Sequence, residues 1–355
     1  MTDAGAKPSE LFDDGELEKA FGSELGEGPG AAETPVPSAA PAADAGGVGA
    51  PVQQSGAVIQ SENAPTFADF REGWSLGLYR DPVIVGVFAG TVLGILGVYV
   101  VLRRAVFVTA AITQAAGLGV AFAFLLEIHG GVHTPPVVGA VILSLAATAV
   151  LSVQTDRMRL PRETLVGLTY LAASAAAVLV GDRITQDAHD ITAILFGTAV
   201  LVRHEDLILV LAVGGAVLAL TFLFHRAFLF AGFDPEGARV HRLPVALLEL
   251  LLWVLVAVTA SVATRAIGAL PVFAFAVLPA MAALALMERV RGAIAVAGAV
   301  GAASGGLGYL FAFFFEFPVG ASQALTATGI LLLCLTVARL RRANAVLANP
   351  PFSAK

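Results

Sequence analysis

Three polar side chains interrupt a long apolar stretch and are the first candidates for chemistry. Thr109, Thr113 and Gln114 lie within the apolar sequence between residues 98 and 126. On a helix, a spacing of four residues puts Thr109 and Thr113 on one face, with Gln114 at its edge. Such a face usually turns toward the interior of a helix bundle. We therefore expect these three side chains to face inward.

A histidine and an aspartate stand side by side further along the chain. His189 and Asp190 precede a short apolar run, and neutral imidazole and carboxylate are ordinary ligands for a first-row divalent ion. This pair is our candidate for metal binding. The simpler interpretation, a capping aspartate beside an interfacial histidine, stays open. Glu127, His129 and His133 form another polar turn, which either receives a solute, docks a partner protein or is merely solvated.

The signatures of nucleotide binding and of hydrolysis are missing from the sequence. It contains no Gly-x-x-x-x-Gly-Lys-Ser/Thr loop to cradle phosphates, so any ATP that drives this protein is expected on another chain. No Ser/His/Asp or Cys/His set has a spacing that argues for a catalytic site. The single cysteine, Cys334, lies in an apolar run and is predicted to pack as a small hydrophobic residue. We expect a protein that is not an enzyme and that holds no cofactor of its own.

The elements that position these residues are predicted to be membrane-spanning helices. Hydrophobic residues make up 57% of the 355 residues and charged residues 14%, which fits an all-α polytopic bundle and excludes an ordinary soluble domain. A bilayer crossing takes about 20 apolar residues. A run at 191–202 is too short for a straight crossing and is predicted to be a re-entrant half-span. About nine longer runs are predicted to be spans: 82–102, 105–126, 137–153, 164–181, 206–224, 245–264, 268–287, 292–315 and 319–338.

The segments outside the spans differ sharply in composition. Residues 1–65 are rich in Gly, Ala and Pro and hold eleven of the 27 acidic residues, so we predict a disordered tail. Residues 66–81 mix aromatic and charged side chains and are predicted to lie at the membrane interface. The transmembrane domain is then expected over 82–342, with a C-terminal tail at 343–355.

Arginines alternate along the chain in a way that indicates orientation. Clusters at 103–104, 157–162, 226–242, 289–291 and 339–342 are separated by arginine-poor turns, which predicts that all five clusters are cytoplasmic. The membrane part is mildly basic, as expected beside anionic lipid. We expect a multi-pass protein of the inner membrane that contacts lipid and no nucleic acid.

Glycines at helical spacing predict close helix packing. Gly86, Gly90 and Gly94 form one such row, and Gly301, Gly305 and Gly306 form another. Small residues let the backbones of neighbouring membrane helices approach each other.

Several stretches resemble the permeases of the zinc/manganese-type (family 3) ABC transporters, over roughly residues 80 to 340. They are Leu-Arg-Arg with its following small-residue-rich span at 102–122, AHDITAILFGTAVLVRHED at 188–206, FDPEGARVHRLP at 233–244, AIGALPVFAFAVLPAMAA at 266–283 and FEFPVGA at 315–321. The chain also departs from that pattern. The family's second span usually carries Gly-Asp and, four residues on, His, where this chain has Thr109-Ala110 and Gln114. Arg242 stands where the family usually has Gly.

The resemblance implies a permease subunit that forms a homodimer and works with a P-loop ATPase and an extracytoplasmic binding protein, with zinc or manganese as cargo. It also implies that a short cytoplasmic helix with Asp234, Pro235, Glu236 and Arg239 couples the permease to the ATPase. Asp234 is a suitable N-cap for that helix, with Pro235 at the first position. The resemblance further implies a translocation path, to which we assign Thr109, Thr113, Gln114 and Pro279. Pro279 frees a backbone carbonyl one turn back, which would serve there as a hinge or an oxygen ligand, with a plain helix kink as the alternative.

Three other interpretations remain open from the sequence. One is an ABC permease for a cargo other than a metal. A second is a secondary transporter, for which Glu249 and Arg265 are the only candidate ionisable groups within the spans, and both fall close to span ends. The third is a membrane scaffold whose acidic tail recruits partners.

Overall fold

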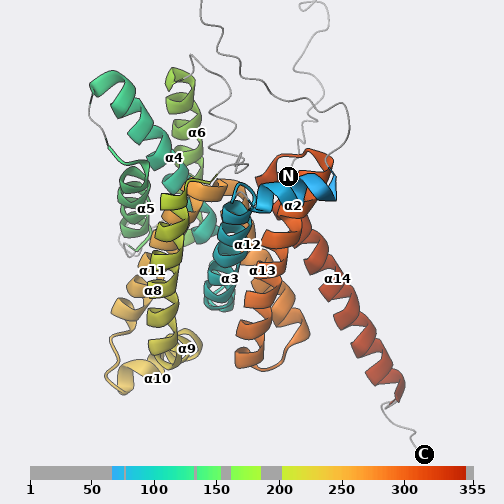
Figure 1. Ribbon diagram of the computed structural model, residues 1–355. Helices are drawn as coiled ribbons and strands as arrows, with labels where there is room; N and C mark the ends of the chain where they lie inside the picture. The colour runs from blue at the N-terminus through green and yellow to red at the C-terminus, as the bar shows by residue number, and fades with distance from the viewer. Residues whose placement is uncertain (1–65, 76, 132–133, 153–160, 185–201, 349–355) are drawn as a thin grey trace, which may run out of the picture. The chain divides into compact units, whose positions relative to one another are not determined.

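The computed structural model of the chain describes residues 66–75, 77–131, 134–152, 161–184 and 202–348. Every regular element in these ranges is a helix, which confirms the predicted all-α class (Figure 1). The expected tail at 1–65, all but the last residue of the half-span at 191–202, and the pair His189 and Asp190 lie outside the described residues.

Among the described residues, eight helices are long and apolar enough to cross a membrane, and a ninth, α5, is shorter at 17 residues. All nine begin within about two residues of a predicted span. The last of them runs to Ala348, past its predicted end at Ala338 and into the segment expected to be a tail from residue 343. The nine are α3 (Arg80–Leu102), α4 (Val106–Gly130), α5 (Pro136–Ser152), α6 (Arg162–Ile184), α8 (His204–Leu223), α11 (Val245–Ile267), α12 (Ala269–Leu286), α13 (Val290–Phe315) and α14 (Val319–Ala348).

Shorter helices flank the spans. Helices α9 (His225–Phe233) and α10 (Pro235–Val240) connect α8 to α11, and α2 (Phe67–Ser75) precedes α3. In α2 the ring of Phe70 packs on Tyr79 and Phe313, with centroid separations of 5.9 and 5.2 Å. Phe67 on the same helix remains 71% exposed. This division between packed and exposed aromatic rings is typical of a helix at a membrane surface.

Helices α3 and α13 approach each other so closely that their backbones meet. A Cβ atom added to Gly90 would overlap the carbonyl of Gly301, and one added to Gly301 would overlap that of Gly90. Gly305 meets the carbonyl of Gly86 in the same way, and Gly94 meets the α13 backbone further along. The two predicted glycine rows are therefore confirmed as close-packing surfaces, and they face each other with α3 and α13 antiparallel.

Other pairs of spans are joined by close contacts of the same kind and by buried hydroxyls. Gly119 of α4 and Gly139 of α5 meet backbone to backbone, and Gly97 brings α3 onto α12. The hydroxyls of Ser144 and Ser261 are 2.7 Å apart and connect α5 to α11. Such hydroxyls bind helix to helix without placing an unsatisfied polar group in the apolar interior.

We predict that Gly90→Ala destabilises the bundle by about 1–3 kcal/mol, the usual cost of forcing an extra methyl group into a packed core. The measurement is the thermal midpoint of the detergent-solubilised protein, followed by size-exclusion chromatography. Gly215→Ala is the matched control, because a Cβ added there meets nothing within 4 Å. Equal thermal midpoints for the two variants would contradict the proposed role of the glycine contact.

Candidate functional site

The predicted polar face of α4 lies inside the bundle. Thr109 and Thr113 are 0% and 1% exposed. The hydroxyl of Thr113 donates to the carbonyl of Thr109 at 2.8 Å, which confirms that the two residues share a face. The hydroxyl of Thr109 has no hydrogen-bond partner among the described residues, whereas Gln114 is only half-buried. Thr109 therefore offers a free hydroxyl within the bundle.

A cavity of about 720 Å³ opens beside the first turns of α4. Its walls include Arg103 and Ala110 from the α4 side, Glu163 and Tyr170 from α6, and Phe273 from α12. Ala110, which replaces the aspartate of the resembled permeases, is thus a lining residue, and neither threonine is. This cavity is the candidate space for a passing solute, and its α4 wall carries the methyl group of Ala110 where the resembled permeases usually have a carboxylate.

Pro279 lies elsewhere in the bundle. It is buried within α12, and a Cβ added to Gly94 would come within 3.3 Å of its side chain. Pro279 therefore packs against α3 and is outside the cavity lining, so the structure does not bring it together with the α4 polar face.

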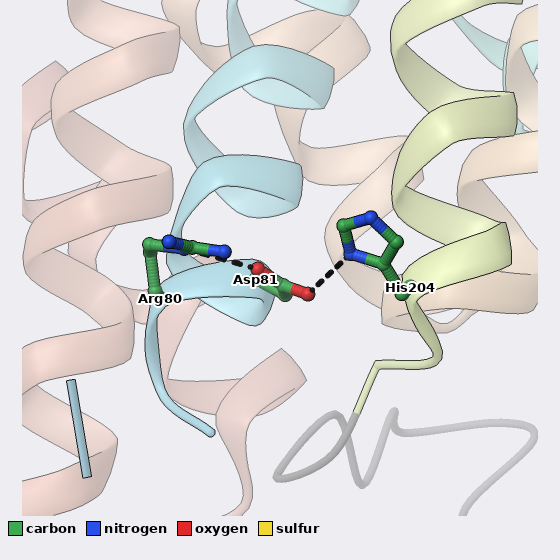
Figure 2. Close-up of polar contacts among 3 residues, drawn as sticks. All are labelled: Arg80, Asp81 and His204. Atoms are coloured by element: carbon green, nitrogen blue, oxygen red, sulfur yellow. Dashed lines mark hydrogen bonds and ion pairs between the residues drawn. The ribbon is translucent and has the colours of Figure 1, made fainter. Parts of the chain in front are cut away.

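A buried carboxylate joins the first turns of α3 and α8 (Figure 2). The side chain of Asp81 is 11% exposed, and its Oδ2 lies 3.0 Å from Nδ1 of His204. Its Oδ1 lies 3.3 Å from Nε of Arg80. A carboxylate held by an imidazole and a guanidinium is satisfied at both oxygens, so this group fixes the two helix ends relative to each other.

A second ion pair joins the first turn of α8 to the last turn of α11. Nε of Arg265 lies 3.0 Å from Oδ1 of Asp206, and both side chains are largely buried, at 20% and 15% exposed. Arg265 therefore has a structural partner and is not an unpaired charge that could couple transport to an ion gradient. Glu249, the other ionisable candidate, accepts a long 3.5 Å hydrogen bond from Nε1 of Trp253.

Sequence reasoning missed Asp81 and His204 as functional candidates. Each stands in the first turn of an apolar span, where a charged residue is unremarkable, and their pairing spans 123 positions of sequence. The one available signal was a carboxylate inside the first turn of an otherwise apolar run. Among the described residues, no three His, Cys, Asp or Glu side chains gather as a metal site requires.

The loop between α8 and α11 contains the helix start that the sequence predicted. Asp234 caps α10 by accepting a hydrogen bond from the backbone N–H of Gly237 at 2.8 Å, and Pro235 occupies the first helical turn. The side chains of Glu236 and Arg239 are exposed. The short helix therefore presents one acid and one base to a partner.

Helix α9 is hydrogen-bonded to the end of α3. The hydroxyl of Tyr99 and Nδ1 of His225 are 2.7 Å apart, and Nη2 of Arg103 donates to the carbonyl of Phe228 at 3.3 Å. Burial lowers the pKa of His225, and the nearby charges of Arg291 and Arg226 lower it further. The imidazole is therefore held neutral and keeps its hydrogen bond to Tyr99.

Arg242 adopts a left-handed backbone conformation, with φ of 60°. This is the position at which the resembled permeases usually have glycine, the residue that enters this region without steric cost. The backbone geometry thus explains the family preference, and Arg242 is strained relative to glycine.

The comparison with protein families identifies most of the chain. The profile of the ABC 3 transport family matches residues 77–338. The manganese transport system membrane protein MntC of Listeria innocua is 27% identical over 270 residues, which cover 76% of this chain and 94% of that protein. The manganese import system permease protein ScaB of Streptococcus pneumoniae is 26% identical over 271 residues, with the same two coverages, 76% and 94%.

Solved structures share the fold. PsaBC from Streptococcus pneumoniae, in complex with Fab, superposes with a TM-score of 0.68 at 25% identity, covering 76% of this chain and 95% of that chain. An ABC transporter of metal-chelate type in an inward-facing conformation gives a TM-score of 0.63 at 14% identity, covering 77% and 90% of the two chains. The second likeness concerns the fold alone.

We predict that Arg242→Gly stabilises the protein by about 0.5–1 kcal/mol. Replacing a left-handed non-glycine residue removes a strain of roughly 1–2 kcal/mol. Part of that gain is lost because glycine makes the unfolded chain more flexible. The thermal midpoint should rise by a few degrees. Arg239→Gly is the control, since it places glycine inside α10 and should lower the midpoint. A fall in stability for Arg242→Gly would show that the arginine side chain compensates for its backbone.

Proposed function

The chain belongs to the ABC 3 transport family, and we propose that it is the membrane-spanning permease subunit that imports a divalent metal ion into the cell. The observation that carries the proposal is the family match over residues 77–338, which extends from the start of α3 well into α14. Manganese is the first candidate for the cargo, because the relatives from Listeria and Streptococcus bear the names of manganese transport proteins. Zinc is the second.

The path we propose runs along α4 and past the cavity beside Ala110. Thr109, Thr113 and Gln114 are the polar residues proposed for it, although the two threonines are buried outside the cavity lining. Neutral hydroxyl and amide oxygens bind a bare divalent ion less tightly than carboxylate and imidazole do. Ligands for the ion must then come from elsewhere. His189 and Asp190 are the pair we propose for this role, and Pro279 acts from α12 as a hinge.

Energy is proposed to come from a separate P-loop ATPase that docks on α10. The exposed charges of Glu236 and Arg239 support this assignment, as does the capped and rigid start of the helix at Asp234 and Pro235. The hydrogen bond between Tyr99 and His225 supplies a physical route from this segment to α3. An extracytoplasmic binding protein and a second copy of the permease complete the proposed transporter.

One competing function draws on a specific observation. An ABC permease for a cargo other than a metal ion is favoured by Ala110, because a methyl group lines the cavity where a carboxylate would attract a cation. A secondary transporter has less support, because Arg265 is committed to its ion pair with Asp206.

We predict that the purified chain alone does not hydrolyse ATP, and that Glu236→Ala or Arg239→Ala lowers co-purification of the ATPase at least tenfold. Both side chains are exposed on α10, so the bundle should stay folded. Arg341→Ala at the end of α14 is the control and should retain the ATPase. Normal recovery of the ATPase with both α10 variants would exclude this helix as the coupling element.

We predict that Ala110→Asp with Gln114→His increases manganese binding if the cargo is a metal ion. The two positions are four residues apart on one helical face, and Ala110 already borders open space. Radioactive manganese uptake by cells and binding to the purified protein are the measurements, with His189→Ala measured in parallel.

The control for this double variant is Ala111→Asp. Ala111 is 0% exposed, so a carboxylate there is buried without a partner and should impair folding by a few kcal/mol. Absence of manganese and zinc uptake by the wild type would refute the cargo. Uptake that survives His189→Ala would refute the ligand assignment.

A further inference from the structure

A second cavity, of about 680 Å³, lies at the end of the bundle that carries α9. It is formed by α9 together with the turn that leads into α13. Three guanidinium groups and an imidazole surround it, contributed by Arg226, Arg289, Arg291 and His225. The cavity belongs neither to the α4 path nor to the capped helix α10.

The positive charge of this cavity is not compensated. None of its three arginines forms an ion pair with a described carboxylate, whereas Asp81 is paired with Arg80 and Asp206 with Arg265. Glu288, which adjoins Arg289, is exposed and makes no such pair either. The lowered pKa of His225, caused partly by Arg291 and Arg226, is a second sign of an unbalanced positive field. An anion entering the cavity would relieve this repulsion.

The cavity lies beside the ends of two spans, where lipid headgroups are expected. His225 and Arg226 follow within three residues of the end of span α8 at Leu223, and Arg291 is the second residue of span α13. Its lining also includes the apolar side chains of Phe230 and Phe233, of which Phe233 is 62% exposed. Basic and apolar side chains in one lining suit a molecule with a phosphate at one end and hydrocarbon at the other.

We propose that this cavity binds the phosphate headgroup of an anionic phospholipid. Arg226, Arg289 and Arg291 contact the phosphate oxygens, and the aromatic wall at Phe230 and Phe233 packs against the first part of the lipid tails. The volume is within the range of small-molecule sites. By holding α9 to the start of α13, the bound lipid braces the segment that Tyr99 joins to α3.

An acidic surface of a partner protein is the competing occupant. The headgroup fits better because basic and apolar side chains line the cavity together and because its residues adjoin span ends, whereas α10 presents exposed charges.

The test uses the full chain in detergent, titrated with phosphatidylglycerol and, separately, with phosphatidylcholine. Bound lipid is counted by native mass spectrometry. We expect wild type to prefer phosphatidylglycerol, and R226Q/R291Q to bind it roughly thirty-fold more weakly, as expected for two basic side chains lost beside an anionic lipid. R339Q/R341Q removes two exposed arginines from the end of α14 and should bind like wild type.

Further arms make every outcome decisive. The single variants R226Q and R291Q, each expected to weaken binding about five-fold, replace the double variant if that variant does not fold. Glycerol phosphate that displaces the lipid at millimolar concentration would identify a site for soluble phosphate and overturn the lipid assignment. Equal binding of both lipids by wild type, or unchanged binding by R226Q/R291Q, would also overturn it. If that variant keeps its lipid but loses the ATPase, the arginines bind protein instead.

Discussion

The direct backbone contact between α3 and α13 is the constraint on which the rest of the bundle depends. Lipid tails are as apolar as side chains, so membrane helices associate through close packing rather than through removal of apolar surface from water. Gly86, Gly90, Gly301 and Gly305 provide that packing and give up helix propensity to do so. Because the two rows of glycines must meet in register, the position of α3 along the axis of α13 is fixed. The positions of both ends of α3 are fixed with it.

Each end of α3 then holds a different partner by polar contacts. At the first turn Asp81 holds His204, and at the last turn Tyr99 and Arg103 hold α9. The contacts differ in strength, because the first is a charge-assisted bond to a buried carboxylate and the second involves a neutral imidazole. The hydrogen bonds to α9 and the glycine contact with α13 therefore meet on the same helix, α3, whose first turn also holds α8.

Local rules predicted most of the fold, and the long-range contacts escaped them. Apolar runs located all nine long helices, glycine spacing located the α3 and α13 contact surfaces, and Asp234 with Pro235 located the start of α10. Each of these signals lies within a few residues of the feature it predicts. The pairing of Asp81 with His204, and the cavity wall shared by α4, α6 and α12, depend on residues that are far apart in the sequence. Spacing along one helix placed Thr109 and Thr113 on a common face but gave no means of telling that Ala110, and not they, borders the open cavity.

The replacement at Ala110 changes what the cavity can contribute to transport. A carboxylate and an imidazole on one helical face would hold a divalent ion strongly, and conduction then requires that the ion also be released. With a methyl group at Ala110 and an amide at Gln114, α4 retains only neutral donors, of which Thr109 is buried and without a partner among the described residues. On the proposed path, the α4 part of the wall would hold a cation weakly and release it readily. Selection of the cargo is therefore expected to rest on groups away from α4, and the α4 wall to serve passage more than recognition.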